Sequence, residues 1–253
     1  MDEPTFETAL SRHDTESIQV RNLDLTSEVM GELPFPAAMY YLWTGEEPTA
    51  GEVRLVDAML SSLMVHGTTA PAIAARLTAH TEPEATQAAI ASGILGVGSR
   101  FVGTMKGCAR HLRDIEESDD REAAVADLVA DFRERGAGFP GIGHPHLHPV
   151  DPRAETLFEM ADEEDIAGDH VAILADIQEA FEAATGADLP INVTGAIAAV
   201  GTDMGLSPDA LRGIAVISRA AGVTGEVLEE HEHPYGGDIW NLVDSNTVDT
   251  EEE

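Results

Sequence analysis

Positive charge is scarce in this sequence. Its 253 residues include 47 Asp and Glu but only 14 Lys and Arg, giving a formal net charge of −33, and Lys106 is the single lysine. A surface this negative repels phosphate backbones and anionic lipid headgroups, so nucleic-acid binding and membrane-surface binding are disfavoured. The sequence also has no run of about 18 consecutive apolar residues, which excludes a membrane-spanning helix.

Cysteine is nearly absent as well. Cys108 is the only one, which excludes an internal disulfide and a zinc site built on cysteines. The sequence begins M-D-E-P, and the absence of an apolar segment after this acidic start is unlike a secretory signal. We therefore expect a cytoplasmic protein.

The excess of carboxylates over lysine points to a salt-rich environment. In dilute buffer a net charge of −33 destabilises a compact chain through self-repulsion. At roughly 1 M salt the Debye length falls to about 3 Å, and the repulsion is screened. The composition thus predicts a halophile's cytosolic protein. The alternative is an acidic mesophilic protein that prefers arginine to lysine.

The apolar residues follow a helical pattern. They make up 43% of a chain long enough for one large domain or two small ones. They recur at helical spacing in residues 53–64, 126–132 and 169–184. Ser207 and Pro208 combine a hydroxyl cap with a proline in the first turn, which predicts another helix start. Because no segment alternates convincingly with the period of a strand, we expect a mostly α-helical protein.

Four segments stand outside this pattern. Residues 93–107 and 136–152 are rich in glycine and proline, and loops of this length in a compact domain are more often functional than passive. Residues 1–17 and 246–253 are polar or acidic, and we expect them to be flexible ends.

The densest cluster of chemically useful side chains lies in residues 141–153. His144 can donate, accept or shuttle a proton near neutral pH, and Arg153 offers a fork for a carboxylate. Asp151 is placed to cap a helix that begins near Pro152. In so acidic a protein, a site that collects arginine and histidine indicates an anionic ligand. The alternative is a surface turn with solvated histidines.

A metal site is a weaker hypothesis for the same segment. His144, His146 and His148 alternate, so in an extended strand they would share one face. The prolines between them argue against a regular strand, and no carboxylate is placed as the remaining ligand. We expect no metal here, and we expect His231 and His233 to lie at the surface.

The string G-I-G-H at residues 141–144, with D-P-R at 151–153, resembles the signature of the citrate synthase superfamily, including the spacing of nine residues from histidine to arginine. Other segments resemble that family in the same chain order. They are V-H-G at 65–67, A-A-R at 74–76, G-S-R-F-V-G at 98–103, P-I-N-V-T-G at 190–195, S-R-A-A-G at 218–222, L-E at 228–229 and H-P at 233–234. The segment at 98–103 is similar to G-D-R-F-G-G in the citryl-CoA lyase module of ATP-citrate lyase. The resemblance covers roughly residues 18–245.

The resemblance implies an all-α, citrate synthase-like fold with a catalytic cleft between a large and a smaller helical domain. By the family pattern, residues 18–103 and 204–245 form the large domain and residues 104–203 form the small one. It also implies a homodimer formed through helices of the large domain.

The same resemblance implies a CoA thioester and a four-carbon dicarboxylate as ligands. The small-molecule partners would be citryl-CoA, acetyl-CoA and oxaloacetate, and no resident cofactor is expected. The positions that match the family's contacts with oxaloacetate or citrate are His66, His144, Arg153 and Arg219. Guanidinium forks suit carboxylates, and imidazoles suit the oxygen between them. The loop with Ser99, Arg100 and Gly103 matches the region that handles CoA and the enolate.

Several positions depart from the family pattern. Val102 stands where synthases have a histidine that donates to the thioester oxygen, and the citryl-CoA lyase module also lacks that histidine. Thr194 stands where the family has its catalytic aspartate, and a threonine hydroxyl is no general base near neutral pH. Tyr235 follows Pro234 where synthases usually have a terminal arginine.

These features together favour a citryl-CoA lyase-like enzyme. It would cleave citryl-CoA, or a related 3-hydroxyacyl-CoA, to acetyl-CoA and oxaloacetate by reversible Claisen chemistry. We expect His144 to be the base for the tertiary hydroxyl, and Thr194 is a candidate donor to the enolate. The alternatives are a citrate synthase that runs the condensation, and a catalytically silent relative that binds acyl-CoA or a dicarboxylate.

Overall fold

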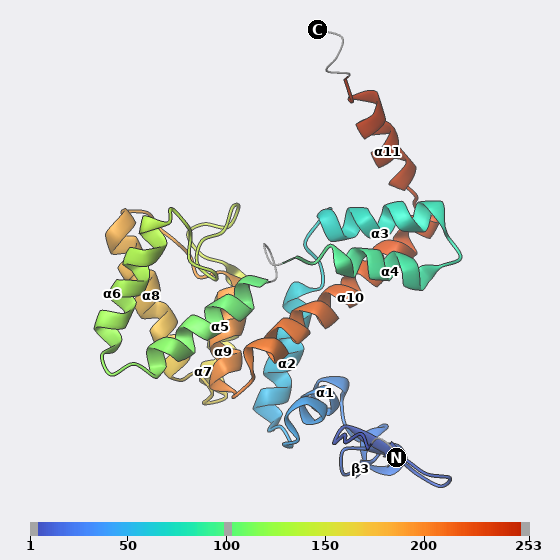
Figure 1. Cartoon of the computed structure of the whole chain (residues 1–253), viewed down its shortest axis with the longest axis horizontal. Helices are drawn as coiled ribbons and strands as arrows, with labels where there is room; N and C mark the ends of the chain where they lie inside the picture. The colour runs from blue at the N-terminus through green and yellow to red at the C-terminus, as the bar shows by residue number, and fades with distance from the viewer. Residues whose placement is uncertain (1–4, 99–102, 249–253) are drawn as a thin grey trace.

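The computed structural model describes residues 5–98 and 103–248, which fold mostly into helices (Figure 1). The helices are α1 (Phe35–Thr44), α2 (Ala50–Leu63), α3 (Ala70–Thr81), α4 (Thr86–Leu95), α5 (Gly103–Glu116), α6 (Arg121–Glu134), α7 (Pro152–Glu163), α8 (Asp169–Thr185), α9 (Val193–Asp203), α10 (Pro208–Glu232) and α11 (Gly236–Ser245), with a π-helical turn η1 (Leu25–Val29) before α1. In the part of the chain that the structure describes, no helix is long and apolar enough to cross a membrane.

A small sheet near the N-terminus corrects the expectation that strands are absent. Strands β1 (Ser11–His13), β2 (Ile18–Val20) and β3 (Leu23–Asp24) pair antiparallel in the order β1-β2-β3. Strands of two or three residues are too short to show a two-residue period, so the sequence pattern could not reveal them.

The helices predicted from apolar spacing are confirmed as α2, α6, α8 and α10. Ser207 caps α10 by accepting a hydrogen bond from the N–H of Ala210, and Pro208 opens the helix. The glycine-rich interruption expected at residues 93–107 is shorter than predicted, because α5 already begins at Gly103. The buried stripe of α5, which includes Met105, Cys108 and Leu112, offsets the cost of roughly 1 kcal/mol for the glycine within this helix.

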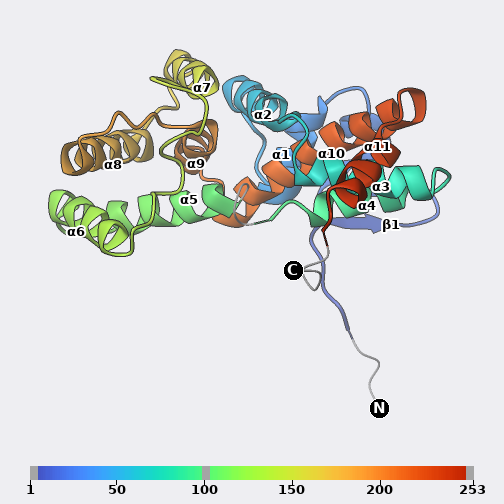
Figure 2. The ribbon, with the colours of Figure 1, turned by 90° about the horizontal axis from the view of Figure 1, so that it is seen from above.

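The helices pack as two groups that are joined by α10. Helices α5, α6, α8 and α9 pack together at one end of the molecule, with α7 against α9, and α3, α4 and α11 lie at the other end (Figures 1 and 2). The long helix α10 contacts members of both groups, and α2 contacts α7. The main hydrophobic core draws its buried side chains from α1, α2 and α5 to α10, among them Leu55 of α2, Leu112 of α5 and Ile197 of α9. A second, smaller cluster joins α3 and α4 to α10 through Ala75, Ala89 and Val223. The domain boundaries inferred from the resemblance stay a prediction.

Candidate active site

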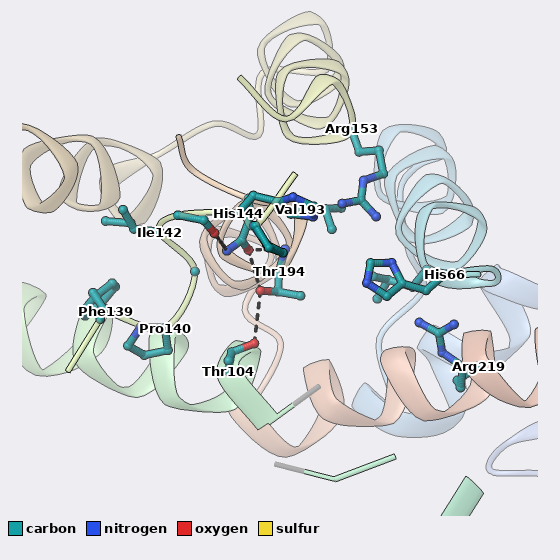
Figure 3. Close-up of a pocket in the computed structure, with 16 residues that line it drawn as sticks. His66, Thr104, Phe139, Pro140, Ile142, His144, Arg153, Val193, Thr194 and Arg219 are labelled. Carbon is teal, nitrogen blue, oxygen red and sulfur yellow. Dashed lines mark hydrogen bonds between the residues drawn. The ribbon is translucent and has the colours of Figure 1, made fainter. Parts of the chain in front are cut away.

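A cavity of about 430 Å³ lies where these groups meet (Figure 3). Its lining comes from the end of α2 and the turn after it, the starts of α5, α7 and α9, the loop at residues 138–145, and the middle of α10. The lining residues are Leu63, His66, Thr104, Gly138, Phe139, Pro140, Gly141, Ile142, Gly143, His144, Pro145, Arg153, Asn192, Val193, Thr194 and Arg219.

The glycine-rich loop is tied to the segment that leads into α9. The N–H of Gly143 donates to the carbonyl of Pro190 at 2.7 Å, and the N–H of Asn192 donates to the carbonyl of Gly141 at 3.0 Å. A Cβ atom at Gly195 would lie 2.4 Å from the carbonyl oxygen of Gly141, so only glycine permits this approach. The positive φ of +102° at Gly141 adds a second need for glycine. This contact fixes His144 relative to α9.

His144 is held in one tautomer by its own loop. Its Nδ1 atom accepts the backbone N–H groups of His146 and Leu147, at 3.1 and 3.0 Å. With Nδ1 occupied as an acceptor, the neutral ring carries its proton on Nε2. Neutral His144 is therefore a hydrogen-bond donor at Nε2. This geometry argues against the base role that we expected from the sequence.

Arg153 is clamped by a buried carboxylate. Asp151 caps α7 by accepting from the N–H of Arg153, as predicted, and its two oxygens also accept from Nε at 3.0 Å and Nη2 at 2.8 Å. The same carboxylate accepts from the N–H of Val193 at 2.9 Å. Burial raises the pKa of Asp151, but the hydrogen bonds from Arg153 and Val193 outweigh it, so the net direction is downward.

Arg219 approaches the cavity from α10, and His66 approaches it from the turn after α2. Arg219 lies on α10, where its Nη1 atom is 3.4 Å from the carbonyl oxygen of Met64. A Cβ atom at Gly222 would lie 1.8 Å from that same oxygen, so glycine lets α10 pass directly against the turn that carries His66. Figure 3 shows His66 between the guanidinium groups of Arg153 and Arg219. The rings of His66 and His144 meet edge-on, with their centroids 6.5 Å apart.

The pKa values of three of these groups are lowered, first by burial and then by neighbouring positive charge. Burial is the largest cause that lowers the pKa of His66, and Arg219 and Arg153 lower it further. The pKa of His144 is also lowered, chiefly by burial, although Asp151 opposes the shift. Burial and the neighbouring Arg153 lower the pKa of Arg219. An anion in the cavity would relieve this repulsion.

Thr194 belongs to a network of neutral groups on the opposite wall. Its Oγ1 donates to Asn192 Oδ1 at 2.6 Å and lies 3.2 Å from Thr104 Oγ1. Asn192 caps α9 through that oxygen, and its Nδ2 donates to the carbonyl of Gly143 at 2.8 Å. The hydroxyl proton of Thr194 is thus directed at Asn192. Among the described residues that line the cavity, none is Asp or Glu.

The structure brings together five of the residues singled out in the sequence, namely His66, His144, Arg153, Thr194 and Arg219. Ser99, Arg100 and Val102 lie outside the described residues. Gly103 begins α5 and precedes Thr104, which lines the cavity.

The three alternating histidines do not gather around a point. Within residues 5–98 and 103–248, no group of three or more His, Cys, Asp or Glu side chains is arranged to hold a metal ion. His231 and His233 are exposed, as predicted.

Sequence reasoning missed the roles of three residues. Asp151 was expected only to cap a helix, and its grip on Arg153 and Val193 was not foreseen. Asn192 and Thr104 were not singled out as cavity residues. Asn192 stands before a helical run, and this position of a typical cap residue is the signal by which its place could have been found. Nothing in the sequence pairs Thr104 with Thr194.

Comparison with known proteins identifies the family. The family model described as "Citrate synthase, C-terminal domain" matches residues 6–240. This chain belongs to the citrate synthase family. The resemblance and the fold class inferred from the sequence are therefore confirmed.

Solved structures of this family include close matches in fold. The citryl-CoA lyase of Hydrogenobacter thermophilus superposes with a TM-score of 0.83 and 28% identity, over 99% of this chain and 93% of that one. ATP citrate lyase of Methanothrix soehngenii, in complex with citrate and coenzyme A, gives a TM-score of 0.79 at 20% identity, over 93% of this chain and 41% of that one.

Curated relatives are longer than this chain. Citrate synthase of Haloferax volcanii is 30% identical over 200 residues, which cover 78% of this chain and 51% of the relative. A probable ATP-citrate synthase of Caenorhabditis elegans is 22% identical over 96% of this chain and 24% of its own length. This family member thus spans about half and about a quarter of these two relatives.

Proposed function

We propose that the cavity binds a four-carbon dicarboxylate and a CoA thioester, and that the chain cleaves citryl-CoA or a related 3-hydroxyacyl-CoA to acetyl-CoA and oxaloacetate. The observation that carries the proposal is the convergence of two arginines and two histidines on one cavity: Arg153, Arg219, His66 and His144. The likeness to a citryl-CoA lyase over 99% of this chain supports the lyase reaction in particular.

The arginines supply the binding energy for the dicarboxylate. Arg153 lies at the start of α7 and Arg219 in the middle of α10, so one ligand with a carboxylate at each end can bridge them. Each guanidinium forms charge-assisted hydrogen bonds, which are about twice as strong as neutral ones. His144 then donates from Nε2 to the oxygen that lies between the two carboxylates.

Cleavage moves one electron pair and needs no oxidant or reductant. The tertiary hydroxyl of the substrate loses its proton, and the bond from the carbinol carbon to the α-carbon of the thioester breaks. The electron pair of that bond becomes the enolate of acetyl-CoA, while the hydroxyl oxygen becomes the ketone oxygen of oxaloacetate. The α-carbon then takes a proton from water.

We propose different proton roles for the two histidines in this scheme. His66, whose lowered pKa keeps it neutral near pH 7, accepts the hydroxyl proton and passes it to solvent. His144 has its Nδ1 lone pair occupied and stabilises the oxygen by donation. The base role is therefore moved from His144 to His66.

The direct test is turnover in molar KCl. Purified protein is incubated with citryl-CoA, and oxaloacetate is detected through NADH oxidation by malate dehydrogenase. We expect turnover that His144→Ala abolishes and that His233→Ala, at an exposed histidine, leaves unchanged. Absence of both turnover and binding of oxaloacetate or CoA would contradict the proposal.

A second candidate function is ligand binding without turnover. The observation that favours it is the absence of Asp and Glu from the described cavity lining, together with the commitment of the Thr194 proton to Asn192. In this case the wild-type chain binds oxaloacetate or CoA tightly but releases no oxaloacetate from citryl-CoA.

Thr194→Asp separates these two candidates. A carboxylate at this position supplies a proton acceptor and donor beside the α-carbon, and general acid–base catalysis contributes roughly 100-fold or more. We expect citryl-CoA cleavage to rise by at least about tenfold, whereas Thr194→Asn, of the same shape but uncharged, gives no rise. If Thr194→Asp folds and binds ligand but shows no gain, the missing carboxylate does not limit the rate.

Citrate synthase chemistry is the further alternative, and the relative from Haloferax volcanii supports it. It joins acetyl-CoA and oxaloacetate to citryl-CoA, which reverses the cleavage, and water then hydrolyses the thioester to release citrate and CoA. By microscopic reversibility the same groups serve both directions, so the loss of a carboxylate slows both by the same factor. The net direction then follows from the concentrations of the ligands. Assaying acetyl-CoA with oxaloacetate beside citryl-CoA measures both directions.

We also propose that the chain works as a homodimer. Exposed apolar side chains on α11, namely Trp240, Leu242 and Val243, support this, since each is more than 60% exposed. Light scattering on the protein in molar KCl should give twice the mass of 26.9 kDa. A monomer at micromolar concentration would contradict the proposal.

High salt is the proposed working condition. The net charge of −33 and the relative from Haloferax volcanii support it. We expect the thermal midpoint to rise markedly between about 0.1 and 2 M KCl, because the Debye length shrinks from about 10 Å to below about 3 Å. A midpoint that is flat across this range would contradict the halophilic reading.

A further inference from the structure

Asp151 is a buried carboxylate whose bonds all lead to the cavity. Its side chain is 0% exposed, and it accepts four hydrogen bonds. Three come from Arg153, through the backbone N–H, Nε and Nη2, and the fourth comes from the backbone N–H of Val193. A carboxylate with this many donors is fully satisfied, so its position is fixed.

The carboxylate also joins the first turns of two helices. Arg153 lies in the first turn of α7, and Val193 is the first residue of α9. The positive ends of both helix dipoles therefore face Asp151, and they stabilise its charge in a buried place. Through Val193, Asp151 sets the position of the turn that carries Asn192 and Thr194.

The clamp determines which edge of Arg153 is left for a ligand. Asp151 occupies the edge formed by Nε and Nη2. Among the residues that the structure describes, none forms a hydrogen bond with Nη1, and Arg153 lines the cavity. A ligand carboxylate can therefore meet only the end of the guanidinium, formed by Nη1 and Nη2.

Asp151 also acts on the charge of both cavity histidines. It raises the pKa of His66 and of His144, against the lowering by burial and the arginines. No Asp or Glu lines the cavity within the described residues. The buried carboxylate of Asp151, which lies outside the cavity lining, therefore offsets part of the positive charge of the lining arginines.

We propose that Asp151 is the positioning residue for the dicarboxylate: it acts through Arg153, aims the Nη1–Nη2 edge at one ligand carboxylate, and holds the start of α9 in register with it. This inference rests on the proposed binding of a dicarboxylate. The affinity for the dicarboxylate should therefore depend on Asp151, whereas the affinity for CoA should not.

The test measures two affinities in each variant by calorimetry in molar KCl. In Asp151→Asn the negative charge is lost, and the NH2 of the amide faces the N–H donors of Arg153 and Val193 instead of accepting from them. The Kd for oxaloacetate should therefore rise roughly 30-fold or more. The Kd for CoA should stay within about threefold, because CoA does not contact Arg153 in this account. Asp151→Ser keeps a cap for α7 while removing the carboxylate, so it should weaken oxaloacetate in the same way even if Asp151→Asn folds poorly.

Asp120→Asn is the matched control. Asp120 also caps a helix, by accepting from the N–H of Ala123 at the start of α6, but it does not line the cavity. Both affinities should be unchanged in this variant. In an Arg153→Ala background, Asp151→Ser should add little further loss of oxaloacetate affinity, since it acts through that arginine.

The outcomes are distinguishable. If wild-type protein binds no oxaloacetate, the proposed function is contradicted, and this inference, which rests on it, is contradicted as well. If the wild type binds oxaloacetate and Asp151→Ser binds it equally well, or weakens CoA to the same extent, the positioning role is overturned while the proposed function stands.

Discussion

Arg76 on α3 and Arg219 on α10 are both at least half-buried arginines, yet their surroundings differ. Arg76 is 1% exposed, with Nε 2.6 Å from Glu226 Oε2 and Nη1 3.2 Å from Glu230 Oε2. Glu229 also pairs with it, and Tyr235 stacks with its ring centroid 4.1 Å away. Arg219 has a single long contact with a backbone carbonyl, and no carboxylate of a described residue pairs with it.

This contrast separates an arginine that joins two helices from one that lines the cavity. The three glutamates come from α10 itself, so Arg76 fastens α3 to that helix. Arg219 is partly buried beside a second arginine, and both burial and Arg153 lower its pKa. Among the described residues no carboxylate forms an ion pair with Arg219, although the charge of Glu226 raises its pKa, and the proposed dicarboxylate would supply that partner.

The largest expected effect is on Arg219. Arg219→Ala should lower turnover, or oxaloacetate affinity, by about 100- to 1,000-fold, because one of the two carboxylate contacts is lost. Its thermal midpoint should not fall, since repulsion with Arg153 is relieved. Arg212→Ala is the control on the same helix, where the guanidinium donates to the carbonyl of Val97 and does not line the cavity. Equal losses in both variants would break the contrast.

Arg76 should show the opposite behaviour. Arg76→Ala leaves a buried Glu230 without its partner, and we expect the free energy of unfolding to fall by about 3 kcal/mol. Oxaloacetate affinity of the folded fraction should be unchanged. Arg54→Ala removes exposed ion pairs to Glu163 and Glu164 and should cost less than about 1 kcal/mol. Chemical denaturation of the three proteins measures these differences.

A smaller effect is expected from pH. The folded pKa values of His66 and His144 lie below the ordinary 6.5, so as the pH falls below that value the unfolded chain takes up these protons first. Stability should therefore fall as the pH drops from about 6.5 through the folded pKa values. A bound dianion raises both pKa values, so binding of oxaloacetate near pH 6 should take up protons. Calorimetry in buffers of different ionisation enthalpy measures this uptake, and zero uptake would contradict the electrostatic account.

The sequence predicts which residues form the site better than it predicts the long-range hydrogen bonds that hold them in place. The nine-residue spacing from His144 to Arg153 and the apolar spacing of α2, α8 and α10 are local patterns. The structure confirms these three helices and brings His144 and Arg153 to one cavity with residues of α2 and α10. The bond from Asp151 to Val193 joins residues 42 positions apart. Such a contact depends on how two helices pack, which no local pattern encodes.

The tautomer of His144 could not be predicted from the sequence for a related reason. A sequence shows that an imidazole is present, but its tautomer depends on which backbone N–H groups reach Nδ1. Here the loop folds back so that His146 and Leu147 donate to it, which turns a candidate base into a donor. The strands β1, β2 and β3 were not predicted, because they are too short to show the two-residue period of a strand.

The most direct test of the central claim is calorimetric titration of oxaloacetate in molar KCl, with wild-type protein and with the Arg153→Ala/Arg219→Ala double variant. The account predicts saturable one-site binding to the wild type and none to the folded double variant. Equal binding to both proteins, or none to either, would contradict the claim that these two arginines converge on a dicarboxylate.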